Sequence, residues 1–251
     1  MILLALSFFL TALLYAAAGF GGGSTYTALL VLADTDYRAV PVISLLCNIL
    51  VVSVGTWRFA RAGHLDWQRS WPLFLLSVPA AWLGGRLHVG ETLFVGLLAV
   101  SLLLAGLLML WQPHWQRETA APRRALWVDP LAGGVLGFLA GVVGIGGGIF
   151  LAPLLYLLRW GAPRAIAATC AAFILVNSIA GLVGQASKGF GAAGAVMADH
   201  AALFPAVLVG GFIGSGIGAK RIDPNWVRVL TALLILYVAV RLGLRFREAL
   251  A

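Results

Sequence analysis

Residues 130–158 read PLAGGVLGFLAGVVGIGGGIFLAPLLYLL and contain no charged side chain. This stretch is longer than the roughly 20 apolar residues that span the hydrocarbon core of a bilayer. Its centre holds a glycine cluster at 144–148, and each glycine costs a helix about 1 kcal/mol relative to alanine. The cluster therefore predicts a break in the membrane segment, with a new helix that begins just after Gly148.

The same pattern occurs 125 positions earlier, where Gly19-Phe20-Gly21-Gly22-Gly23 matches Gly144-Ile145-Gly146-Gly147-Gly148. Further short parallels follow in the same order along the chain: Arg38-Ala39-Val40 with Arg164-Ala165-Ile166, Trp71-Pro72 with Phe204-Pro205, and Gly84-Gly85-Arg86-Leu87 with Gly218-Ala219-Lys220-Arg221. We therefore predict two homologous transmembrane repeats, 1–111 and 130–251, joined by a polar linker at 112–129. Internal repeats are common in secondary transporters, whose substrate sites lie at the repeat interface near the midplane.

Charge placement supports a membrane protein. Of the 251 residues, 61% are hydrophobic and 10% are charged, whereas a soluble domain carries about 25% charged residues. The charges leave eight long apolar segments, at 1–33, 39–57, 70–85, 92–111, 130–158, 165–187, 201–219 and 225–244. Apolar runs of this length exclude the alternating strands of a membrane barrel. The sequence predicts an all-α polytopic bundle of about eight segments in two four-segment repeats.

The net charge of +8 does not indicate nucleic-acid binding, because the basic residues are scattered singly through the connections. Fifteen of the 17 basic residues are arginine, a bias typical of GC-rich bacterial genomes. The first segment has no positive region before its apolar stretch, and its pattern recurs at 130–148. We therefore expect it to belong to the mature fold rather than to a signal peptide. No metal ligands cluster, and we expect no cofactor.

A helix that begins inside the membrane can bind an anion through its first backbone N–H groups, without any charged side chain. In the first repeat, Ser24 and Thr25 would cap such a helix and add hydroxyl donors. In the second, Ile149 cannot cap the helix and Pro153 would bend or restart the chain. The candidate substrate-binding residues of the two clusters are Gly21, Gly22, Gly23, Ser24 and Thr25, and Gly146, Gly147, Gly148, Ile149 and Pro153.

The alternative is that glycines only permit close helix packing. Two other runs, each spaced by four on one helix face, fit that interpretation well: Gly133, Gly137 and Gly141, and Gly210, Gly214 and Gly218. The spacing within the two GxGGG clusters does not favour a single helix face, so a functional break is the preferred interpretation for them.

Buried polar side chains add three candidate binding residues. Asn48 and Asn177 are amides inside apolar segments, and Thr169 shares the segment of Asn177. An unpaired amide in such a place costs several kcal/mol, and interhelical hydrogen bonds explain these residues about as well as a shared polar cavity does. No Asp or Glu lies in the middle of a segment, which argues against a cation pathway built on carboxylates.

The paired GxGGG clusters, the proline after the second (Gly144 to Pro153), the turn at 63–67 and the basic end of segment seven together resemble the sulfite exporter TauE/SafE family. The resemblance covers essentially the whole chain. It implies a carrier or exporter of the bacterial inner membrane for small sulfur-containing anions such as sulfite, sulfoacetate or other organosulfonates. Alternating access around a site between the two broken helices would then move the anion. The lipid bilayer is the other partner, and nucleic acid is not one.

Three questions stay open at this point. An anion channel or a non-transporting assembly protein would share many of these features, whereas an enzyme is not expected, because all four histidines lie in loops or at segment ends. The coupling ion (proton or sodium), the direction of transport and the formation of a homo-oligomer are undetermined. If all eight segments cross, the two sides hold 10 and 7 basic residues; if the first and fifth re-enter, the sides hold 6 and 11 and the repeats become inverted.

Overall fold

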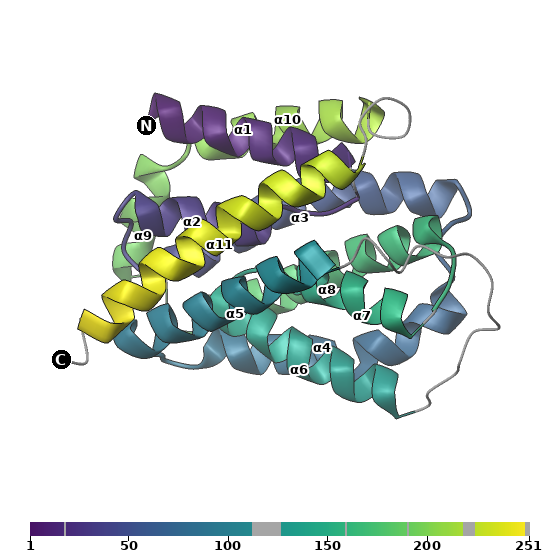
Figure 1. The fold of residues 1–251 in the computed structure, drawn as a ribbon. Helices are drawn as coiled ribbons and strands as arrows, with labels where there is room; N and C mark the ends of the chain where they lie inside the picture. The colour runs from purple at the N-terminus through teal and green to yellow at the C-terminus, as the bar shows by residue number, and fades with distance from the viewer. Residues whose placement is uncertain (18, 112–126, 159, 190, 218–223, 249–251) are drawn as a thin grey trace.

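A computed structural model describes residues 1–17, 19–111, 127–158, 160–189, 191–217 and 224–248 of the chain (Figure 1). The described part folds into helices only, as the sequence predicts, and contains no strand. The helices are α1 (Ile2–Ala17), α2 (Gly23–Leu32), α3 (Val40–Arg61), α4 (Trp67–Arg86), α5 (Glu91–Trp111), α6 (Val128–Val143), α7 (Gly148–Leu157), α8 (Pro163–Ala186), α9 (Gly191–Asp199), α10 (Leu203–Ile217) and α11 (Pro224–Glu248). Most of the 112–129 linker and the Gly218–Arg221 motif lie outside the described residues.

Three of the described helices are long and apolar enough to cross a bilayer: α3, α5 and α8. The two segments that carry glycine clusters are each divided. Residues 2–32 form the 16-residue α1 and the 10-residue α2, and residues 128–157 form α6 and α7, again of 16 and 10 residues. Each divided segment therefore supplies one long and one short helix on either side of its glycines.

The first helix of each divided segment packs against a helix from the other half or the other end of the chain. Helix α6 runs parallel to α4, because Gly133 lies on the backbone of Leu73 and Gly141 on that of Ala81. Helix α1 runs parallel to α10, with Gly210 on the backbone of Phe9. These contacts confirm the packing role predicted for the glycine runs spaced by four, except for Gly218, which lies outside the described residues.

The remaining long helices pair in opposite directions. Helix α3 is antiparallel to α8. Phe59 of α3 and Ala167 of α8 both lie next to Gly19, whereas Leu45 lies near Gly181. Helix α5 is antiparallel to α11, since Gly96 meets Phe246 and Gly106 meets Leu236. The α3–α8 and α5–α11 pairs thus each lie head to tail.

The short helix α2 turns back along the chain. It is antiparallel to α3, because Gly21 lies against Val52 and Thr27 bonds to Ser44. Helix α10, and α1 with it, runs parallel to α3, because Gly211 lies against Val51 and Ser215 bonds to Arg58. Helices α1 and α2 therefore form a hairpin whose bend is the first glycine cluster.

Helices α6 and α7 form the corresponding hairpin in the second half. Helix α8 runs parallel to α4, as the Ser70–Thr169 hydrogen bond and the approach of Gly85 to Gly181 show. Helix α7 is antiparallel to α8, because Gly146 lies against Ser178 and Gly148 lies by the Cys170 carbonyl. With α6 parallel to α4, the chain again reverses at its glycines.

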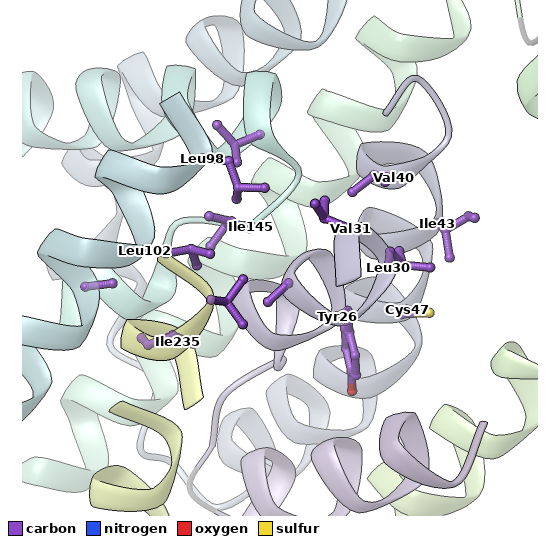
Figure 2. Close-up of a cluster of buried hydrophobic side chains, with 14 of the residues drawn as sticks. Tyr26, Leu30, Val31, Val40, Ile43, Cys47, Leu98, Leu102, Ile145 and Ile235 are labelled. Atoms are coloured by element: carbon purple, nitrogen blue, oxygen red, sulfur yellow. The ribbon is translucent and has the colours of Figure 1, made fainter. Parts of the chain in front are cut away.

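Figure 2 shows how deeply α2 is buried. Tyr26, Leu30 and Val31 of α2 are surrounded by side chains of α3, α5 and α11 and by Ile145 of the second cluster. Helix α2 carries no charged residue and is buried along almost its whole length, as expected of a helix in a protein interior. This packing holds the first glycine cluster in the centre of the protein, next to the second.

Candidate anion-binding site

Both short helices begin at a left-handed glycine. Gly22 is the N-cap of α2 with φ 83°, and Gly147 is the N-cap of α7 with φ 77°. This backbone region is accessible to glycine at little cost. The first amides of a helix have no acceptor within it, and those of Gly23, Ser24, Gly148 and Ile149 have none elsewhere in the described part of the chain. Two sets of free N–H groups therefore lie in the interior.

The predicted caps at Ser24 and Thr25 are wrong. The N-cap Gly22 carries no side-chain hydrogen bond, and Thr25 Oγ1 instead lies 2.8 Å from Tyr15 Oη. A capping side chain must precede the first turn, whereas Ser24 and Thr25 already lie inside it. The first amides of α2 are consequently not occupied by its own hydroxyls.

The two glycine clusters touch each other. A methyl group added at Gly23 would collide with the carbonyl oxygen of Ile145. The Ser44 hydroxyl joins the two clusters, because its Oγ lies within donating distance of the Gly23 carbonyl oxygen (3.1 Å) and of the Gly144 carbonyl oxygen (2.9 Å). The same Oγ accepts a hydrogen bond from Thr27 Oγ1. Residues about 120 positions apart in sequence thus form one buried region.

Asn48 lies between the clusters, as a shared site requires. Its side chain is fully buried, and Nδ2 donates to the Ile145 carbonyl oxygen at 3.3 Å. A methyl group at Gly21 would lie 2.6 Å from Asn48 Oδ1, and one at Gly146 would lie 2.8 Å from Nδ2. One amide therefore contacts both hairpin bends.

Other predicted site residues have different surroundings. Asn177 Nδ2 donates to the Phe173 carbonyl within its own helix at 2.8 Å, and its Oδ1 has no hydrogen-bond partner within the described part of the chain. Thr169 pairs with Ser70 at 3.0 Å and so joins α8 to α4. Pro153 is buried inside α7, which continues through it rather than restarting there.

Two serines absent from the predicted site belong to it by contact. Ser44 bridges the clusters, and Ser178 Oγ lies 3.3 Å from a methyl group placed at Gly146. The signal that would have identified them is a spacing of four: Ser44 and Asn48 on α3, and Ile174 and Ser178 on α8. In the second half, the side chain that contacts the glycine cluster from the adjacent long helix, as Asn48 does in the first half, is Ile174 rather than Asn177.

The site is polar but uncharged. Every buried polar side chain that the structure describes is neutral, and no group of three potential metal ligands occurs among the described residues. Charged groups lie at helix ends instead: Arg58 donates to Ser215 Oγ at 2.9 Å, and Lys188, whose pKa is lowered by partial burial, donates to the Leu87 carbonyl. Free amides and hydroxyls in a neutral interior favour a small anion.

Comparisons with known proteins find relatives among membrane transporters. The sequence profile of the family described as sulfite exporter TauE/SafE matches residues 4–242. A probable membrane transporter of Sinorhizobium fredii is 32% identical over 95% of this chain and 96% of its own length. A probable membrane transporter of Methanocaldococcus jannaschii is 26% identical over 70% of this chain and 68% of its own. No solved structure gives a significant match.

Proposed function

The chain belongs to the sulfite exporter TauE/SafE family of membrane transporters, and from that premise we propose that it carries small sulfur-containing anions across the bacterial inner membrane. Sulfite, sulfoacetate and other organosulfonates are the substrate class. Each presents several oxygen acceptors around one sulfur atom, which suits a group of converging N–H donors. The free amides at the starts of α2 and α7 are the observation that carries the proposal.

The binding residues are those of the two bends. The amides of Gly21 to Ser24 on one side and of Gly146 to Ile149 on the other supply donors, and the positive ends of both helices stabilise the negative charge. Asn48 lies between them, with Asn177, Thr169 and Pro153 in the surrounding α7–α8 layer. Because no charged side chain is buried among the described residues, binding is weak enough for release on either side.

Alternating access follows from the arrangement of helices. The head-to-tail pairing of α3 with α8 and of α5 with α11 supports two inverted repeats, and the two hairpins would then enter the membrane from opposite sides. Rocking of one repeat against the other would expose the bends to each side in turn. The apolar packing of α2 (Figure 2) provides the seal on one side of the bends.

Anion-dependent thermal stability of the purified protein tests the substrate class. A ligand at 100 times its Kd stabilises a protein by about 2.7 kcal/mol. We expect sulfite and sulfonates to raise the Tm in a saturable way, and acetate at the same ionic strength to raise it much less. Equal stabilisation by acetate would contradict the proposed selectivity for sulfur anions.

A further inference from the structure

The Asn48 amide is held in one orientation. Nδ2 donates to the Ile145 carbonyl oxygen, and a flipped amide would place Oδ1 against that oxygen, where two acceptors repel. Oδ1 is therefore the end of the amide that does not face the Ile145 carbonyl, and it has no hydrogen-bond partner among the described residues although Asn48 is fully buried. A buried acceptor without a donor costs roughly 1–3 kcal/mol, so this oxygen needs an explanation.

The unpaired oxygen lies against the bend that starts α2. Methyl groups added at Gly21 and Gly23 would lie 2.6 Å and 2.9 Å from Asn48 Oδ1. The neighbouring bend holds a second unpaired hydroxyl, Ser178 Oγ, beside Gly146. The site thus combines free N–H donors with free oxygen acceptors.

This combination discriminates between ligands. A fully deprotonated oxyanion, such as an organosulfonate, has only acceptors, so it would still bind the amides but more weakly than a protonated one, because it meets Asn48 Oδ1 with repulsion. A sodium ion would bind Oδ1 but would face the positive ends of α2 and α7, which disfavour a cation. An oxyanion that retains one O–H satisfies both, since its O–H donates to Oδ1 while its other oxygens accept from the amides.

We propose that Asn48 is a specificity-determining residue that selects the singly protonated monoanion, hydrogen sulfite in the case of sulfite. This proposal rests on the proposed function. The substrate then carries its own proton: hydrogen sulfite binds on one side, leaves on the other, and there dissociates into sulfite and H⁺ as the local pH dictates. No buried carboxylate is needed, in keeping with the neutral interior of the described residues.

The test is the pH dependence of radiolabelled sulfite uptake into proteoliposomes, corrected for uptake by protein-free vesicles. When only one protonation state binds, the apparent affinity falls with the fraction of that state. At pH values above the second pKa of sulfurous acid, we expect the KM expressed as total sulfite to rise about tenfold per pH unit. The KM expressed as the concentration of hydrogen sulfite should stay constant. A KM for total sulfite that stays flat or falls with pH overturns the role of Asn48, as does an absolute requirement for sodium.

Two variants test whether Asn48 causes the pH dependence of the KM for sulfite. Asn48→Leu keeps the volume and removes the acceptor, so we expect kcat/KM for sulfite to fall at least about tenfold, or 1.4 kcal/mol, and any remaining uptake to lose its pH-dependent KM. Thr56→Val, also on α3 and at a buried hydroxyl without a partner, should keep the wild-type profile. An Asn48→Leu protein with the wild-type profile contradicts the proposal. Absence of saturable uptake by the wild type at every pH would instead refute the proposed function.

Discussion

Glycine at position 22 is required by backbone conformation and by space. Its φ of 83° lies in the left-handed region, and an added methyl group would lie 3.0 Å from both Thr11 Cγ2 and Tyr26 Cζ. The sequence alone predicts this site, because the glycine clusters and the amides inside apolar segments can be recognised without a structure. The bridging role of Ser44 and the free Ser178 hydroxyl were not predictable, because they depend on which helix faces lie against the bends.

At this scale, Gly22→Ala should lower the Tm. A left-handed conformation costs a residue with a Cβ about 1–2 kcal/mol, and crowding by Tyr26 adds to that. Gly55→Ala is the matched control, since nothing lies within 4 Å of a methyl group there; its helix should gain up to about 1 kcal/mol. Thermal unfolding in detergent compares the two, and a Gly22→Ala protein as stable as Gly55→Ala would speak against the left-handed bend at Gly22.

Helix pairs are set by glycines at the contact as much as by apolar side chains. The run Gly133, Gly137 and Gly141 lets α6 lie directly on the α4 backbone, and the sequence predicted that role from the spacing alone. The partner helix was not predictable, because a small-residue face is complementary to many others. Only the folded chain shows that α6 packs on α4 and α1 on α10.

Gly137→Leu should therefore separate α4 from α6. The added side chain would meet the Ser77 backbone, and overpacking of this kind costs typically about 1–3 kcal/mol, sometimes more. Gly243→Leu in α11, where no atom lies within 4 Å of the added carbon, should leave stability nearly unchanged. Size-exclusion profiles and Tm values of the two purified variants give the comparison; equal behaviour of both would argue against the α4–α6 contact.

Cross-linking tests the antiparallel pairing of α5 and α11. In a protein with Cys47→Ala and Cys170→Ala, the pairs Gly96→Cys with Phe246→Cys and Gly106→Cys with Leu236→Cys should each be joined by a short thiol-specific cross-linker, because the paired residues are in contact. The exchanged pair, Gly96→Cys with Leu236→Cys, should not. Efficient cross-linking of the exchanged pair would show a parallel arrangement instead.

The orientation of the whole molecule follows from where the hairpins place the connections. Figure 1 shows the start of α1 and the end of α11 on the same side. With hairpins at both glycine clusters, the connections on that side carry six of the 17 Lys and Arg residues and those on the opposite side carry eleven. By the positive-inside rule, we expect the opposite side to be cytoplasmic. The sequence could not choose between crossing and re-entry, because reversal at the glycines depends on the contacts of α2 with α3 and α1 with α10.

Reporter fusions test this orientation in cells. Alkaline phosphatase fused after Ala251 should be active and green fluorescent protein dark, because we expect that end outside the cytoplasm. Reporters inserted in the 112–126 connection should show the reverse. A fluorescent C-terminal fusion in a correctly folded protein would contradict the inverted arrangement, which depends on both hairpins re-entering.

Backbone amides at the two hairpin bends are proposed to hold the anion, and sulfite uptake by proteoliposomes tests this role most directly. We expect saturable uptake by the wild type. Gly22→Leu and Gly147→Leu should each reduce kcat/KM at least about tenfold, since each side chain would displace the bend, while Gly55→Leu should stay within a factor of about two. Unchanged saturable uptake by folded Gly22→Leu and Gly147→Leu proteins would contradict this role.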